Sequence, residues 1–190
     1  MAAPAVKRWT IAEFLAWDDG TDRRYELIDG VPVAMAPPSE AHGTIVVNLA
    51  IAVGAQLQPP CRVVGEAGIV LPDRDDAWYQ ADLAVTCTPP EPGRTYVADP
   101  VLIAEVLSPS TAVHDRGLKL VDYCRLASVR EILLVSSTER SVQYWRRDGA
   151  RWLVEDLIGE ATLTLETAPS PISLATIYEG SGTPAGSGRR

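Results

Sequence analysis

Three acidic residues stand inside segments that are otherwise apolar, and they are the first candidates for chemistry. Glu26 lies in YELI, Asp82 in YQADLAVTC and Glu105 in VLIAEVLS. Burying an ionised carboxylate costs several kcal/mol unless it is paired with a cation or bound to a metal. One such acid is explained by a turn or by a neighbouring arginine, but two of them on successive strands suggest a common site.

Asp82 and Glu105 lie on two successive predicted strands, and each is followed by further apolar residues. This pattern predicts that the strands run side by side and direct both carboxylates at one point. Paired carboxylates suit a hard cation such as Mg²⁺, which prefers oxygen ligands and keeps waters and phosphate oxygens in its shell. The predicted cofactor is therefore Mg²⁺, with Mn²⁺ as an alternative.

A basic residue, Lys119, lies on the helix predicted after the second acidic strand, with Tyr123 four residues later on the same face. A cation beside a two-carboxylate metal site can orient or deprotonate a water, or stabilise charge developing on a phosphate. Arg116 lies one turn before Lys119, where it can touch a phosphate. The competing interpretation is an exposed Lys119 paired with Asp115 or Asp122, and Lys119 taken alone favours it.

The two histidines lie at or just before the beginning of predicted helices. His42 lies at the beginning of a long predicted helix, where a local hydrogen bond is a simpler interpretation than catalysis. His114 lies in the turn before the Lys119 helix and is expected to be exposed and structural.

The three cysteines, Cys61, Cys87 and Cys124, are widely spaced without a CxxC pair, which predicts reduced thiols in a cytoplasmic protein.

The composition limits the classes of protein that the chain can form. Its 190 residues are 46% hydrophobic, enough for a core of its own, and no run is long and apolar enough to cross a bilayer. The net charge of −8 argues against broad, non-specific binding to nucleic acid. Residues 115–151 nevertheless carry eight Lys/Arg against five Asp/Glu, and such a face can hold a polyanion, particularly where metal ions offset clustered acids.

The elements that must position these residues follow from local signals. A capping box of Thr10 and Glu13 predicts a helix over about residues 11–17, and the Asp-Gly in YELIDGVPVA predicts a hairpin. Apolar residues at helical spacing predict a helix over about residues 39–58. Strands are expected in RVVGEAGIVL, WYQADLAVTC, VLIAEVLS and REILLVSS, followed by a hairpin in RSVQYWRRDGARWLVEDLIG and a helical turn in SLATIYEG.

A helix capped by Ser110 or Thr111 and ending near Leu126 separates two of these strands, so a parallel pair is expected from Val101 to Ser137. The predicted fold class is α/β, a mixed β-sheet flanked by helices. We expect a single domain over residues 1–180 and a flexible C-terminal tail over residues 181–190.

The segments YELIDGVPVAMAPPSEAH, ADLAVT and VLIAEVLSPSTAVHDRGLKLVDYCRLASVREILLV together resemble the Uma2 family, which is assigned to the PD-(D/E)XK, restriction-endonuclease-like superfamily. The resemblance runs from about Thr10 to Tyr178. The sequence differs from the superfamily pattern at two positions. Ala81 stands where a proline usually precedes the first acid, and Leu107 stands where the superfamily lysine usually lies, two residues after Glu105.

The resemblance implies a role for each candidate. It makes Asp82 and Glu105 ligands of Mg²⁺, with the carbonyl oxygen of Val106 as a third ligand. The family lysine, moved from the strand to the next helix, matches Lys119 and would position or activate the attacking water. Two further matches are Glu26, which would complete the acidic cluster, and His42.

Three functions compete at this stage. The first is a Mg²⁺-dependent endonuclease that hydrolyses phosphodiester bonds in DNA. The second is a non-catalytic module that keeps the nuclease fold and binds nucleic acid or protein, which the acidic pI of about 4.8 favours. The third is a hydrolase or transferase acting on a small phosphorylated molecule. A homodimer is expected because cutting both strands needs two sites. The hairpin at YWRRDGARW is a candidate interface or DNA-facing edge, and the simpler interpretation is an ordinary sheet edge.

Overall fold

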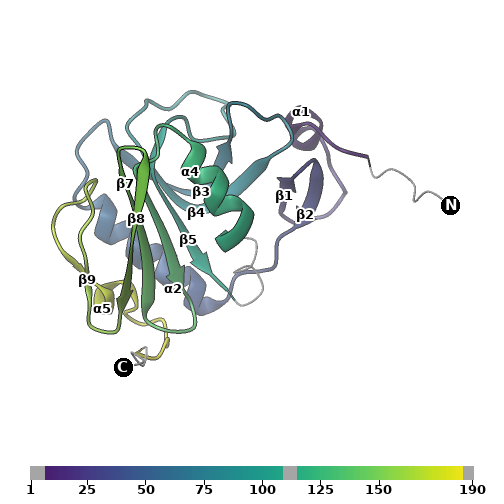
Figure 1. The fold of residues 1–190 in the computed structure, drawn as a ribbon. Helices are drawn as coiled ribbons and strands as arrows, with labels where there is room; N and C mark the ends of the chain where they lie inside the picture. Colours follow the sequence, from purple (N-terminus) through teal and green to yellow (C-terminus); the bar gives the residue numbers. More distant parts are fainter. Residues whose placement is uncertain (1–6, 109–114, 186–190) are drawn as a thin grey trace.

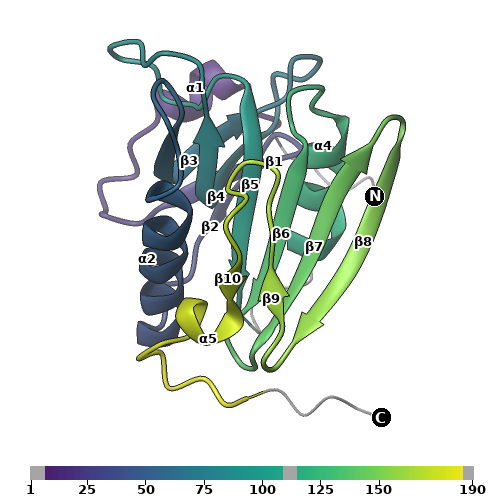
Figure 2. The same cartoon turned by 90° about the vertical axis from the view of Figure 1, so that its left-hand side faces the viewer.

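The structure, a computed structural model, describes residues 7–108 and 115–185, and gives only the backbone of residues 115 and 116. These residues form a mixed sheet of eight strands covered by helices on both faces (Figures 1 and 2). This arrangement confirms the predicted fold class. Within the described residues, none of the helices has the length and apolar character needed to cross a membrane.

The large sheet contains the strands of every segment that was expected to be extended. They are β1 (Tyr25–Ile28), β2 (Val31–Ala34), β3 (Arg62–Val70), β4 (Trp78–Thr86), β5 (Pro100–Leu107), β6 (Glu131–Ser136), β7 (Ser141–Asp148) and β8 (Arg151–Ile158). Their order is β2-β1-β4-β5-β6-β7-β8, with β3 paired to β4 outside this path. Strands β5 and β6 are parallel, as predicted, and the other pairs are antiparallel.

Local sequence explains the N-terminal elements. The Thr10 hydroxyl accepts the N–H of Glu13 while the Glu13 carboxylate accepts the N–H of Thr10, so the capping box begins helix α1 (Ile11–Leu15) as expected. The β1–β2 hairpin turns at Asp29 and Gly30, whose φ angles are 49° and 73°. Positive φ at both central residues is the requirement of a type I′ turn, which Asp-Gly satisfies.

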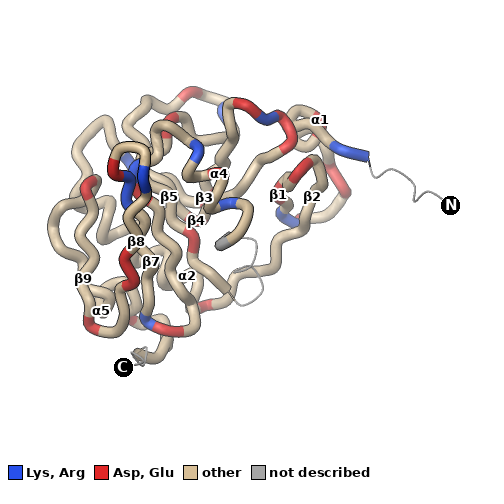
Figure 3. Tube along the Cα trace, viewed as in Figure 1, with Lys and Arg blue, Asp and Glu red and all other residues tan. Residues whose placement is uncertain are grey.

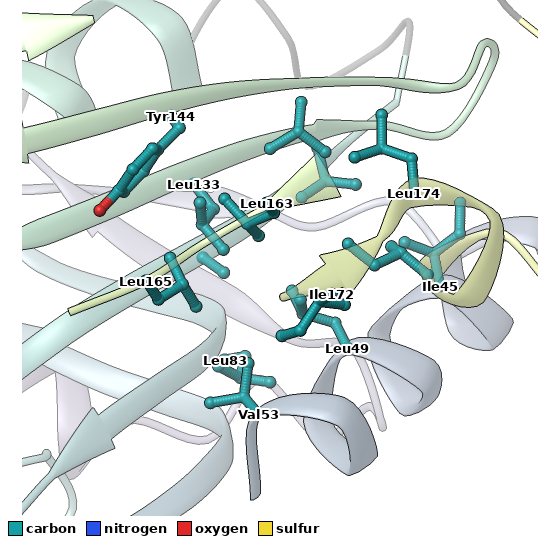
Figure 4. Packing of buried hydrophobic residues seen from close by; sticks show 14 of the residues in the cluster. Ile45, Leu49, Val53, Leu83, Leu133, Tyr144, Leu163, Leu165, Ile172 and Leu174 are labelled. Atoms are coloured by element: carbon teal, nitrogen blue, oxygen red, sulfur yellow. The ribbon is translucent and has the colours of Figure 1, made fainter. Parts of the chain in front are cut away.

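Two apolar clusters lie on opposite faces of the sheet. On one face, helix α2 (Glu40–Gly54) buries Ile45, Leu49 and Val53 against the strands. The small strands β9 (Thr162–Leu163) and β10 (Ile172–Ser173) and the helix α5 (Leu174–Ile177) cover the same face (Figure 4). Each fully buried aliphatic side chain contributes about 1.5–3 kcal/mol, so this cluster fixes the sheet on which the acids lie.

Helix α4 (Leu120–Arg125) covers the other face and follows a π-helical turn over Asp115–Lys119. Its Leu120 and Tyr123 pack with Ile103 of β5 and Ile132 of β6. The predicted end of this helix near Leu126 is confirmed, because Leu126 is its C-terminal cap. The predicted caps Ser110 and Thr111, together with His114, lie outside the described residues.

The prediction of three reduced cysteines is wrong for two of them, because Cys61 and Cys87 form a disulfide. The antiparallel register pairs Arg62 of β3 with Thr86 of β4, so the residues next to this pair are brought together although 26 positions separate them. Sequence spacing carries no sign of that register. Cys124 is a free thiol, and the cysteine pattern no longer supports a cytoplasmic location.

The beginning of the expected tail is held against the β6–β7 turn. Thr183 is 7% exposed, and its hydroxyl donates a hydrogen bond to the Ser137 carbonyl. The carbonyl of Pro184 accepts the N–H of Arg140. Residues 186–190 of that tail lie outside the described residues.

Candidate active site

The candidate site lies where two neighbours of β4 diverge. Strand β3 pairs with one edge of β4 over nearly its whole length, so the other edge must serve both β1 and β5. Strand β1 reaches it at Trp78, and β5 pairs with it from Leu83 onward. Between these contacts the N–H groups of Gln80 and Asp82 need other acceptors.

Carboxylates provide those acceptors. The N–H of Gln80 donates to Oε1 of Glu26 at 2.8 Å, and the N–H of Asp82 makes a longer contact of 3.4 Å with Oε2 of Glu105. The acids inside apolar segments therefore satisfy the backbone of a strand whose neighbours have separated. This explains why the sheet tolerates them, and it brings three of the predicted residues to one place.

Asp82 and Glu105 face each other across the antiparallel β4–β5 pair, as predicted. The register pairs Leu83 with Ala104, which places the two acids opposite each other one residue further along. One Asp82 oxygen accepts the N–H of Val106 at 2.7 Å. The Asp82 side chain is 20% exposed and that of Glu105 is 4% exposed, so the pair lies at the boundary between core and solvent.

Lys119 is buried among these acids and is not an exposed helix residue. Its Nζ lies 2.7 Å from Oε1 of Glu26 and 3.6 Å from Oε1 of Glu105, and its side chain is 6% exposed. The interpretation that Lys119 is exposed and pairs with its helix neighbours is therefore wrong. An ammonium enclosed in this way neutralises carboxylates that would otherwise repel one another.

Tyr123 lies one helical turn after Lys119, and its hydroxyl donates to Oε1 of Glu105 at 2.6 Å. The side chain is fully buried, which leaves no surface for the predicted contact with substrate. In the structure the tyrosine holds Glu105. The same carboxylate oxygen thus faces both the tyrosine hydroxyl and the Lys119 ammonium.

His42 reaches the site from helix α2. Ser39 caps this helix by accepting the N–H of His42, which places the histidine in the first turn. Its Nε2 lies 3.1 Å from Oδ1 of Asp82. A purely local hydrogen bond was the wrong interpretation, because the imidazole contacts a carboxylate 40 residues away. The side chain of Arg116 lies outside the described residues.

Two further buried acids were not identified from the sequence. Glu131 is fully buried and accepts hydrogen bonds from the Tyr144 hydroxyl, the N–H groups of Glu166 and Thr167, and the Thr167 hydroxyl. Asp122 is 6% exposed and accepts the Tyr79 hydroxyl at 2.5 Å. Glu131 opens the apolar strand β6, whereas the acids of the site lie inside their strands, and the partners of Glu131 hold the C-terminal segment in place.

A compositional signal for Lys119 was also missed. The chain has two lysines, Lys7 and Lys119, and all its other basic residues except histidine are arginine. Lys7 is exposed, whereas Lys119 is buried. An arginine is the usual choice for a structural ion pair, and a compact ammonium is suited to work at a reacting centre.

The donor set fits a hard cation, although it is small. Among the described residues, no group of three or more His, Cys, Asp or Glu side chains is spaced to hold a metal ion. Mg²⁺ is commonly bound by one or two carboxylates, with waters and substrate phosphates completing its shell. Asp82 and Glu105, opposed on adjacent strands, provide that number of carboxylates.

The mixed sheet of eight strands flanked by helices gives this protein a restriction-endonuclease-like fold. Its structure matches a crystal structure described as "a putative nuclease belonging to DUF820" from Anabaena variabilis, with a TM-score of 0.69 and 20% sequence identity. The match covers 89% of this chain and 97% of that one, which shows a common fold.

The chain belongs to the Uma2 family, described as "Putative restriction endonuclease", whose sequence model matches residues 11–176. It is similar to two uncharacterized proteins of Synechocystis sp. The first is 30% identical over 171 residues, covering 88% of this chain and 90% of the relative. The second is 27% identical over 170 residues, covering 84% and 93%.

Proposed function

We propose that this protein is an endonuclease that hydrolyses phosphodiester bonds in DNA with Mg²⁺ as its cofactor and Mn²⁺ as a substitute. The observation that carries the proposal is the enclosed Lys119 ammonium between Glu26 and Glu105, since the second of these carboxylates also contacts the N–H of Asp82. Family membership and the likeness to a nuclease fold support it.

In this proposal Asp82 and Glu105 hold Mg²⁺, together with the carbonyl oxygen of Val106. The bound metal supplies Lewis acidity toward the phosphate and lowers the pKa of water. Lys119 donates a hydrogen bond from Nζ to the attacking water and balances the negative charge that develops on the phosphate oxygens. Glu26 keeps the ammonium in place through its contact at 2.7 Å.

His42 and Tyr123 act on the carboxylates. The imidazole Nε2 fixes the orientation of Asp82, while the Tyr123 hydroxyl holds Oε1 of Glu105. Hydrogen bonds to metal-binding carboxylates reduce their freedom to rotate, and loss of such contacts commonly lowers metal affinity or activity by about 10- to 100-fold. Both residues are therefore assigned to positioning.

A homodimer is part of the proposal, because cutting both strands of a duplex needs two sites. A cytoplasmic location is also part of the proposal, because that is where the proposed DNA substrate lies. Light scattering on the purified protein measures the mass directly. A mass of one chain would remove the dimer from the proposal without affecting the site.

A second candidate, a binding module that keeps the fold without catalysis, is favoured by the net charge of −8. Such a charge weakens attraction to a polyanion. Metal binding separates the two candidates. Calorimetric titration with Mn²⁺ should show a site in the wild type that is lost in Asp82→Ala, whereas a module without catalysis should show no heat from that site in either protein.

The direct test of the proposal is cleavage of supercoiled plasmid and of single-stranded DNA by the wild-type protein, with Mg²⁺, with Mn²⁺ and with chelator. We expect nicked or linear product with either metal and none with chelator. If neither DNA is cut in any of the three conditions, the endonuclease assignment is wrong.

A further inference from the structure

The loop between β3 and β4, residues 71–77, carries an arginine that contacts carboxylates from three segments. Arg74 pairs with Asp29 in the β1–β2 turn, with Asp76 in its own loop and with Asp122 on α4. Nε lies 2.7 Å from Asp76 and Nη1 lies 3.6 Å from Asp122. Figure 3 shows the acidic and basic residues alternating along this loop, near α1 and α4.

These contacts are largely enclosed. The Arg74 side chain is 23% exposed and that of Asp122 is 8% exposed. Asp122 also accepts the Tyr79 hydroxyl of β4 at 2.5 Å, and Arg125 lies 3.3 Å from its other oxygen. The hydrogen bonds to Asp76 and Asp29 raise the pKa of Arg74 above its usual value, so these contacts stabilise the charged guanidinium.

The network lies close to the site along the chain. Asp29 follows Glu26 by three residues on the hairpin, and Asp122 follows Lys119 by three residues along the helical segment that includes α4. The register shows one β1–β4 pair, Leu27 with Trp78, so the ladder itself holds the hairpin at a single point. The N–H of Gly30 adds one further bond to the Asp76 carbonyl. Arg74 therefore joins the two elements that provide the Glu26–Lys119 pair.

We propose that Arg74 is a positioning residue, which keeps hairpin β1–β2 and helix α4 at the separation that lets Lys119 reach both Glu26 and Glu105. The effect of Arg74 on catalysis rests on the proposed function, whereas its effect on the placement of Lys119 is independent of that function. The alternative is an ion cluster that only stabilises the loop. Removing such a cluster would lower stability and leave the environment of Lys119 unchanged.

The presence of two lysines makes the placement of Lys119 measurable without any assay of activity. Under native conditions an amine-acylating reagent should modify the exposed Lys7 quickly and the buried Lys119 slowly, and mass spectrometry of peptides reads both rates in one sample. In Arg74→Met, which keeps the length of the side chain but removes its charge, we expect the Lys119 rate relative to Lys7 to rise by about tenfold or more.

Two controls separate positioning from general stability. Arg125→Met removes another cation from Asp122 but leaves Arg74 in place, so Lys119 should stay protected. Glu131→Gln weakens a buried network away from the site and should also leave the native rate at Lys119 unchanged. If Arg74→Met fails to fold, Asp29→Asn takes its place. This variant removes only the contact between Arg74 and the half-exposed carboxylate of the β1–β2 turn, and the acylation rate of Lys119 should again rise.

Unchanged protection of Lys119 in folded Arg74→Met, or an equal rise in Arg125→Met, would overturn the inference. For cleavage, we expect a kcat lower by about 10- to 100-fold in Arg74→Met with an unchanged KM for DNA. Absence of cleavage by the wild type would count against the proposed function, while the acylation rates would still decide the role of Arg74.

Discussion

Lys119 Nζ lies 2.7 Å from Oε1 of Glu26, and both side chains are less than a tenth exposed. The ammonium comes from the turn leading into a helix on one face of the sheet, and the carboxylate comes from a hairpin that touches the sheet edge. The pair therefore connects two elements that the ladder of the sheet does not join directly. Its stability and its chemistry are coupled, and both can be measured.

Breaking this pair from one side should be costly. Either Lys119→Met or Glu26→Gln removes one partner of a buried ion pair, which typically lowers the free energy of unfolding by about 3–5 kcal/mol. The double variant removes both charges and should lose less than the sum of the single losses. Urea unfolding of the four proteins gives the coupling energy, and additive losses would show that the two groups do not interact.

Tyr123→Phe removes one hydroxyl and leaves the packing of the ring in place. Loss of a hydrogen bond to a buried carboxylate should lower stability by about 1.5–3 kcal/mol. Plasmid cleavage should fall by about 10- to 100-fold because Glu105 loses a contact that orients it. Initial rates at saturating metal measure this effect.

The matched control is Tyr178→Phe. Tyr178 is also buried, and its hydroxyl donates to the Ser136 and Ser141 carbonyls, away from the acids. The Tyr178→Phe variant should be less stable than the wild type and should keep the wild-type cleavage rate per folded molecule. Equal losses of activity in the two variants would argue against a specific role for Tyr123.

Glu131→Gln separates a structural carboxylate from those of the site. The glutamine loses the charge that four donors share and presents an amide N–H₂ to one of them, which should lower stability by about 1–3 kcal/mol. Cleavage per folded molecule should remain at the wild-type level. If cleavage per folded molecule instead falls strongly, the distinction between Glu131 and the acids of the site is wrong.

The grouping of the site residues was predictable from the sequence in part. Acids in apolar strands predicted the Asp82–Glu105 pair, and the antiparallel register confirms it. The burial of Lys119 was not predictable from the residue alone, because it depends on a partner in a hairpin about 90 positions earlier. The contact of His42 with Asp82 depends likewise on how α2 crosses the sheet.

The elements themselves were more predictable than their long-range partners. The capping box of α1, the Asp-Gly turn and the buried face of α2 are local signals, and each is present in the structure. The Cys61–Cys87 pair and the partners of Glu131 depend on strand register and on the path of the C-terminal segment. Periodicity along the chain contains no information about either.

The pH dependence of stability should reflect Asp76. A hydrogen bond from Arg74 lowers the pKa of this carboxyl, so the charged form is favoured in the folded state. A carboxyl whose pKa is lower in the folded state stabilises that state at pH values above its unfolded pKa, about 3.9. This stabilisation is lost as the pH falls through the folded pKa. Urea unfolding should show the difference between wild type and Asp76→Asn to be largest near neutral pH and to shrink below about pH 4. A difference that grows on acidification would contradict the assigned direction.

In the proposed function, Lys119 serves a metal-dependent cleavage at the Asp82–Glu105 pair. Plasmid cleavage by wild type and Lys119→Ala, purified identically and compared with Mg²⁺ and with chelator, tests it most directly. Circular dichroism should first show that the variant is folded. We expect metal-dependent cutting by the wild type and a loss of at least about 100-fold in the variant. Equal cutting by both proteins, or no cutting by the wild type, would contradict it.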